Sequence, residues 1–173
     1  AQQAVPPAAP QPATQPHPRD SQPYTNGALT GLNPNLPTLF IAGDSTAATG
    51  ARTARDNNPI RGWAALLVDY FDTSKINLAN YAIGGATLNS YLAPGRGGGP
   101  SSWDQLLAAV KPGDYVVIQF GQNSGPLAGA GEEVQERAGR GGGPPTVMHT
   151  HGWYVRKMIN DVKAKKATPL PAT

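Results

Sequence analysis

The most constraining feature of this sequence is a short apolar run, residues 39–42 (LFIA), that passes directly into Gly43-Asp44-Ser45-Thr46. An apolar run this short, closed by glycine and polar residues, is typical of a strand buried on both faces of a parallel sheet. Ser45 is then expected at the strand's carboxyl end, where open α/β sheets bind ligands and where a serine becomes a nucleophile if a base is supplied. The same residues would equally suit a simpler role, the capping of a following helix.

Two further strands are expected, at residues 75–81 and 114–120. The second is the clearest in the chain because it is both β-branched and apolar. Strand and helix patterns alternate from residue 38 onward. This alternation predicts an α/β protein in which right-handed crossovers connect the strands of a parallel sheet.

Apolar residues also recur at helical spacing, which predicts amphipathic helices. The three segments with this pattern are residues 63–71, 103–110 and 155–162. In the first, Trp63 and Tyr70 are expected to face the core. Ser101 or Ser102 is the expected N-cap of the second.

Polar or glycine-rich segments follow three successive predicted strands, at Gly43 to Ser45, Gly84-Gly85 and Gly121 to Asn123. The carboxyl ends of parallel strands meet at one edge of a sheet, so these segments are expected to converge. A serine nucleophile needs N–H donors aimed at the oxyanion that develops on attack. The backbone at Ser45 and Gly85 and the side-chain amide of Asn123 are candidate donors. The alternative is three ordinary strand-to-helix turns.

Composition divides the chain into two parts. Residues 1–36 are predicted to be a Pro/Ala/Gln-rich disordered linker, and residues 37–173 a folded domain. The chain opens Ala1-Gln2-Gln3 with no methionine and no basic apolar leader. That start favours an exported protein, secreted or periplasmic in a bacterium, from which the signal peptide has been removed. A boundary inside a longer sequence fits the same start.

Composition also argues against several classes of protein. The chain has no cysteine, so it has neither a disulfide framework nor a thiolate metal site, and no apolar stretch approaches the length of a membrane span. The net charge is only +3, with the basic excess concentrated in residues 156–166. A nucleic-acid partner is not expected, because no basic patch with interleaved aromatic residues is present. The sequence does not indicate an oligomeric state.

The three converging segments also carry a resemblance. In order and context, Gly43-Asp44-Ser45, residues 82–85 and Gly121-Gln122-Asn123 resemble the first three conserved blocks of the GDSL/SGNH hydrolases. Within that superfamily, TLFIAGDST, NYAIGGAT, GDYVVIQFGQN and HGWYVRKMI resemble the rhamnogalacturonan acetylesterase-like carbohydrate esterases. The resemblance covers about residues 37–169.

The resemblance implies a flavodoxin-like, three-layer α/β/α fold. It also implies that Ser45 is the nucleophile, and that Gly85 N–H and Asn123 Nδ2 join Ser45 N–H in an oxyanion hole. Enzymes of this family remove acetyl groups from sugars through an acyl-enzyme, without a metal or other cofactor. An acetylated carbohydrate is therefore the implied partner, such as the rhamnogalacturonan of pectin in plant cell walls.

The chain departs from the family pattern in two places. Gln122 and Ser124 stand where the family usually has histidine and aspartate, and the Asp-x-x-His pair that supplies the family's base does not occur. Residues 165–173 run out where a further strand should begin. We therefore expect a C-terminally truncated esterase domain that lacks full activity, an expectation that robust turnover by residues 1–173 would refute.

His149 and His151, just before the last predicted helix, are candidate substitutes for the missing base. A second function class, a non-catalytic carbohydrate-binding pseudoenzyme, fits the same departures. Nucleotide binding fits poorly, because no phosphate-binding glycine motif follows the first strand.

The hexapeptide GRGGGP occurs twice, at residues 95–100 and 139–144. Arg96 and Arg140 within it are candidates to pair with uronate carboxylates of an acidic polysaccharide. The alternative is a flexible, low-complexity insertion.

Overall fold

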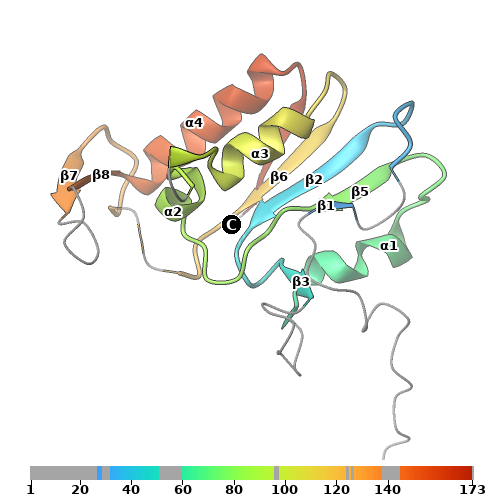
Figure 1. The fold of residues 1–173 in the computed structure, drawn as a ribbon, viewed down its shortest axis with the longest axis horizontal. Helices are drawn as coiled ribbons and strands as arrows, with labels where there is room; N and C mark the ends of the chain where they lie inside the picture. The colour runs from blue at the N-terminus through green and yellow to red at the C-terminus, as the bar shows by residue number, and fades with distance from the viewer. Residues whose placement is uncertain are drawn as a thin grey trace, which may run out of the picture.

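A five-stranded sheet with the order β1-β5-β2-β6-β9 forms the centre of the protein (Figure 1). This computed structural model describes residues 27–28, 32–50, 60–95, 98–123, 125, 127–137 and 145–172. The parallel strands are β2 (Thr38–Gly43), β5 (Asn77–Asn80), β6 (Tyr115–Gln119) and β9 (Thr168–Ala172). The short β1 (Gly27–Ala28) pairs antiparallel with β5. The predicted α/β fold with a parallel sheet is confirmed.

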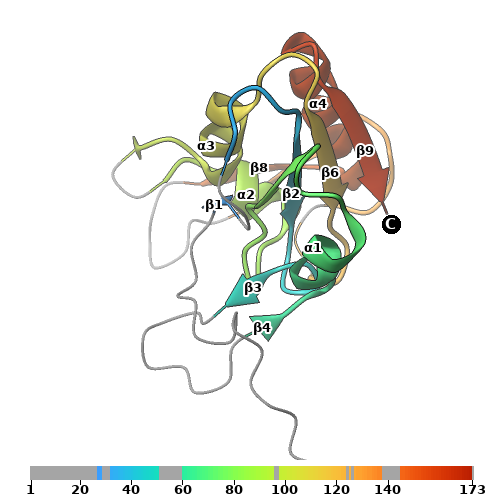
Figure 2. The same cartoon turned by 90° about the vertical axis from the view of Figure 1, so that its right-hand side faces the viewer.

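Alternate residues of β2 pack into separate layers, as expected for a strand covered on both faces. Phe40 and Ala42 share a core cluster with residues of α3 (Ser102–Ala109) and α4 (His151–Ala164). Leu39 and Ile41 instead pack in a cluster with Ala64 and Leu67, near α1 (Leu67–Tyr70). Figures 1 and 2 show α3 and α4 above the sheet and α1 below it, which gives the three layers of the predicted architecture.

The second and third predicted helices form where the sequence placed them. Ser101 caps α3 in a capping box: its hydroxyl accepts from Asp104 N, and the Asp104 carboxylate accepts from Ser101 N at 2.9 Å. In α4, Met158 and Val162 are buried, as the predicted apolar face requires.

The first predicted helix forms only as a short 3₁₀ turn, η1 (Trp63–Leu66), that leads into α1. Its predicted apolar face is wrong: Tyr70 is 81% exposed and Trp63 37% exposed, whereas Ala64 is fully buried. The backbone here lies close to the turn after β2: Gly62 N donates to Ala48 O at 2.7 Å and Trp63 N donates to Thr46 O at 2.9 Å. A Cβ at Gly62 would lie 2.4 Å from the backbone of Ala47, so only glycine fits at position 62.

A strand also forms where the sequence was expected to run out. The strand β9 pairs with β6 from Thr168 to Ala172, although Pro169 and Pro171 lack an N–H group. Thr168 donates its N–H to Asp114 O at 2.8 Å, so the alternate residues Pro169 and Pro171 direct their missing donors away from β6. Prolines at these two positions therefore cost no hydrogen bond to β6.

Part of the predicted linker also contacts the sheet. Gly27–Ala28 form β1, and Asn33 N donates to Asn77 Oδ1 at 2.8 Å. Residues 1–26 lie outside the described part of the chain.

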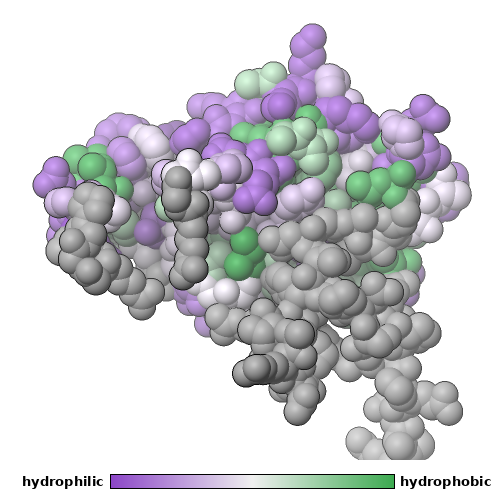
Figure 3. Space-filling view, in the orientation of Figure 1, coloured by the Kyte–Doolittle hydropathy of each residue, from purple (hydrophilic) through white to green (hydrophobic). Residues whose placement is uncertain are grey.

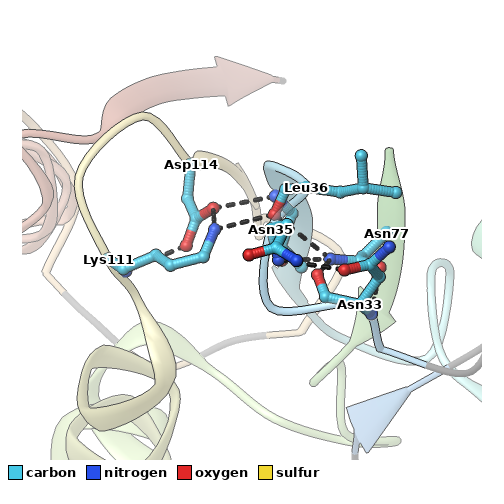
Figure 4. Close-up of polar contacts among 7 residues, drawn as sticks. Asn33, Asn35, Leu36, Asn77, Lys111 and Asp114 are labelled. Carbon is cyan, nitrogen blue, oxygen red and sulfur yellow. Dashed lines mark hydrogen bonds and ion pairs between the residues drawn. The ribbon is translucent and has the colours of Figure 1, made fainter. Parts of the chain in front are cut away.

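The amino end of the sheet is fixed by a polar cluster around Asp114, shown in Figure 4. The fully buried Asp114 carboxylate accepts from Thr38 N at 2.8 Å, from Lys111 N at 2.9 Å and from Lys111 Nζ at 2.8 Å. Lys111 Nζ also donates to Leu36 O at 2.8 Å. These bonds join the start of β2 to the turn before β6.

Several short elements lie outside the predicted pattern. They are α2 (Leu88–Leu92), the hairpin of β7 (Val134–Arg137) and β8 (Thr146–His149), and the ribbon of β3 (Thr49–Gly50) and β4 (Ile60–Arg61). The β7–β8 hairpin projects beyond α2 and the start of α4 (Figure 1). Hydrophobic colour appears over this hairpin in Figure 3, where Val134 and Val147 are more than half exposed.

Candidate active site at the carboxyl edge of the sheet

The three predicted site segments follow neighbouring strands. In the sheet β2 lies between β5 and β6, and Gly43 is in register with Gln119. On the other side, Ile83 N donates to Gly43 O at 2.9 Å. The segments after β2, β5 and β6 therefore leave the sheet at one edge, as predicted.

Ser45 is half-buried in a tight turn that directly follows β2. The backbone N–H groups of Ala47 and Ala48 both donate to Asp44 O, at 3.2 and 2.9 Å. The chain then continues into β3, so the helix that these residues were expected to precede does not begin here. Within the described part of the chain, no hydrogen bond involves the Ser45 hydroxyl, which leaves it open to a substrate or a base.

The neighbouring Asp44 is fully buried and organises this turn. Its Oδ1 accepts from Thr46 N at 2.9 Å and lies 2.8 Å from Thr46 Oγ1. Thr46 Oγ1 also lies 2.7 Å from Gln119 Oε1 at the end of β6. Asp44 Oδ2 is buried without a hydrogen-bond partner. Asp44 therefore acts on the turn that presents Ser45 rather than on a helix.

Gly85 lies in an open turn at this edge, in a backbone conformation that favours glycine. Its φ of +80° lies in the left-handed region that favours glycine, and nothing lies within 4 Å of a Cβ built there. Asn123 lies beside the same segment, because its Nδ2 donates to Ala86 O at 2.8 Å. The second N–H of that amide is free to serve another acceptor.

The two candidate histidines lie in different environments. The His149 ring stacks on Trp153, with 3.6 Å between centroids and 8° between planes, and its Nδ1 is buried without a partner. His151 instead lines a pocket together with Asn123. The structure therefore places His151 beside a predicted oxyanion donor, near the edge where the sequence made it a candidate.

The structure describes only one of the four other residues that the sequence singled out, Gln122, Ser124, Arg96 and Arg140. Gln122 is exposed. Ser124, Arg96 and Arg140 lie outside the described residues.

Two carboxyl groups with lowered pKa values, Asp72 and Asp104, lie outside this edge. Hydrogen bonds from Lys75 and Ser74 hold the pKa of Asp72 below its usual 3.8. The hydroxyl and N–H of Ser101 do the same for the pKa of Asp104 in α3. Both shifts belong to local turn and capping contacts.

In the part of the chain that the structure describes, no group of three or more histidine, cysteine, aspartate or glutamate side chains is placed to hold a metal ion. Among the same residues, no helix combines the length and apolarity needed to cross a membrane.

The sequence model of the GDSL-like Lipase/Acylhydrolase family matches residues 41–173, which include all three site segments. The chain belongs to this family. The family predicted from Gly43-Asp44-Ser45 and the two following blocks is thus confirmed.

Curated relatives narrow the likeness within the family. A rhamnogalacturonan acetylesterase of Emericella nidulans is 35% identical over 89 residues, which cover 51% of this chain and 29% of the relative. The rhamnogalacturonan acetylesterase RhgT of Bacillus subtilis is 32% identical over 85 residues, 49% of this chain and 32% of the relative. The chain thus spans about a third of the length of these relatives.

A solved structure supports the fold. The crystal structure of YxiM from Bacillus subtilis has a TM-score of 0.50 at 24% identity and covers 79% of this chain, which spans 32% of the YxiM chain. At this identity the likeness shows a shared fold alone. The curated YxiM sequence is described as an uncharacterized esterase.

Proposed function

We propose that this chain carries the nucleophile of a serine esterase that removes acetyl groups from carbohydrate, rhamnogalacturonan being the favoured substrate. Family membership and the two acetylesterase relatives support this proposal. The observation that carries it is the convergence of Ser45, Gly85 and Asn123 at one sheet edge. Because this polysaccharide lies outside the cell, we also propose export of the protein.

In this proposal Ser45 Oγ attacks the carbonyl carbon of the acetyl ester while a base takes the hydroxyl proton. The oxyanion that forms accepts hydrogen bonds from Ser45 N, Gly85 N and the free N–H of Asn123 Nδ2. Collapse of this intermediate breaks the ester C–O bond, and the sugar leaves as an alcohol after protonation. Water then hydrolyses the acetyl-serine and releases acetate.

The base completes this mechanism, and in the described residues no imidazole bonds to Ser45. A second candidate is a carbohydrate-binding protein without catalysis, which Gln122 and Ser124 favour because they replace the histidine and aspartate usual in the family. His149 is already stacked between aromatic neighbours, so it is less available as a base than His151.

Labelling with a fluorophosphonate, read by mass spectrometry, separates the two candidates. We expect slow labelling of Ser45 in the chain 1–173, accelerated by added imidazole, because a small base can replace a missing one. Ser45→Ala should abolish the adduct, and Asn123→Ala should slow its formation by about a hundredfold.

The matched control is Ser74→Ala, which removes an exposed hydroxyl far from this edge and should label at the wild-type rate. Labelling that survives Ser45→Ala would show that another residue is the nucleophile. No adduct at Ser45 at any imidazole concentration would refute the esterase and leave the binding protein.

A further inference from the structure

A pocket of about 190 Å³ adjoins Asn123 on the side of α2 and the start of α4. We call it the Asn123 pocket and define it by six lining residues: Thr87, Leu88, Phe120, Asn123, Leu127 and His151. It lies among segments that follow β5, follow β6 and begin α4. The proposed reaction uses only its Asn123 wall, so the rest of the pocket is free for another part of a substrate.

The lining divides into an apolar and a polar part. Leu88 and Phe120 are almost fully buried, so Leu127, which is half-buried, offers a ligand most of the apolar surface among these three side chains. Asn123 and His151 supply planar polar groups that both donate and accept hydrogen bonds. This combination suits a sugar ring, which has apolar C–H faces and hydroxyl groups around its rim.

The walls of the pocket are held by hydrogen bonds in the unliganded protein. The loop residue Leu127 donates its N–H to His149 O at 3.0 Å and accepts from His151 N at 2.8 Å. Thr150, between these histidines, is buried and bonds to Gly131 O at 2.6 Å. His151 therefore begins α4 on a fixed backbone, and binding need not order the loop first.

The opposite wall is fixed in a similar way. Thr87 begins α2 with a capping box, in which its hydroxyl accepts from Ser90 N at 3.3 Å while Ser90 Oγ accepts from Thr87 N at 2.9 Å. The Thr87 hydroxyl also donates to Asn89 Oδ1 at 2.6 Å. Thr87 is thus occupied by local bonds, which leaves His151 and Asn123 as the polar groups available to a ligand.

We propose that the Asn123 pocket binds one monosaccharide ring of the acetylated substrate and that His151 hydrogen-bonds a hydroxyl of that ring. The inference rests on the proposed esterase, since Asn123 would join the pocket to the oxyanion hole. The volume equals roughly six water molecules, more than a two-carbon acyl group alone occupies. His151 is then a substrate-binding residue and not the base.

The test of this proposal measures the binding of a methyl galactopyranoside that carries one O-acetyl group. Saturation-transfer NMR detects the binding, and titration of the whole chain with the glycoside gives the dissociation constant. We expect His151→Ala to weaken binding about tenfold, the effect of one lost hydrogen bond. Ala128→Trp, which places a large side chain at another lining position, should weaken binding at least as much. Because Ala128 is exposed, this variant removes no interior contact and serves if His151→Ala fails to fold.

His149→Ala is the matched control, because it removes an imidazole two residues away that does not line the pocket. Ethyl acetate serves as a ligand that has the acyl group without the sugar. The proposal is overturned if the wild-type chain does not bind the glycoside, or if both pocket variants bind it as tightly as wild type. Ethyl acetate should bind the wild-type and His151→Ala chains equally, because it has no ring hydroxyl for His151 to bond; an about tenfold weaker affinity of His151→Ala for ethyl acetate would also overturn the proposal.

Labelling of Ser45 in the same preparations separates this inference from the proposed function. Labelling without binding of the glycoside overturns the pocket assignment and leaves the esterase intact. Binding without labelling supports the pocket and overturns the esterase.

Discussion

Replacement of Asp114 by alanine is expected to cost a large part of the stability of this protein. The carboxylate is fully buried and accepts from two backbone N–H groups, those of Thr38 and Lys111, in addition to Lys111 Nζ. Alanine removes the acceptor and leaves both N–H groups without a partner. The ammonium is less affected, because its side chain is 41% exposed and it also bonds to Leu36 O.

The magnitude follows from the two orphaned N–H groups. A buried donor left unsatisfied costs about 1–3 kcal/mol, so the pair costs about 2–6 kcal/mol and we expect a loss of about 4 kcal/mol. A typical domain has about 5–15 kcal/mol in total, so the Asp114→Ala chain should keep about 1–11 kcal/mol.

Urea unfolding followed by tryptophan fluorescence measures this loss, and the buried Trp103 provides a signal. Lys111→Met is the control, because it removes only the partly exposed ion pair and should cost about 1–2 kcal/mol. A loss below about 1 kcal/mol for Asp114→Ala would refute the reasoning from unsatisfied donors. Equal losses for the two variants would show that the ion pair, and not the N–H groups, matters.

Two other variants test local features. Bonds from Ser101 hold the pKa of Asp104 below 3.8, so its contribution is present above that pH and disappears as pH falls through the lowered pKa. Asp104→Ala should therefore lose about 1 kcal/mol at pH 7, and its difference from wild type should shrink as pH falls through the lowered pKa, which urea midpoints at a series of acidic pH values would measure. Tyr70→Ser should change the free energy of unfolding by less than about 0.5 kcal/mol, because Tyr70 is 81% exposed. A loss above about 2 kcal/mol in the same assay would indicate that Tyr70 packs against the core, as the helical spacing predicted.

Three of the strands and two of the helices could be predicted because their signals are local. Each of β2, β5 and β6 contains buried apolar residues and is followed or closed by glycine or a polar residue. The capping box of Ser101 and Asp104 is likewise complete within four residues of sequence. The convergence of the three site segments was predicted from the same signals, because parallel strands bring their carboxyl ends to one edge of the sheet.

The features that were missed depend on contacts between distant segments. Helical spacing favoured Trp63 as an inward residue, but its backbone pairs with the 46–48 turn and Ala64 is the buried residue. Proline is unfavourable in a strand where its missing N–H would face a neighbouring strand, and the sequence alone does not show which way Pro169 and Pro171 of β9 face. The Asn123 pocket is assembled from three separate segments, and a single histidine in the sequence does not reveal it.

Asp44 and Asp114 show how the two ends of the sheet differ. Both carboxylates are fully buried. At the amino end, each oxygen of Asp114 has at least one donor, and the cluster fixes the start of β2. At the carboxyl end, Oδ2 of Asp44 has no partner, beside a serine whose hydroxyl is also unpaired in the described structure. A buried carboxylate oxygen without a donor reduces stability. Features that reduce stability tend to concentrate at functional sites, so this contrast independently favours the Ser45 edge as the site of chemistry.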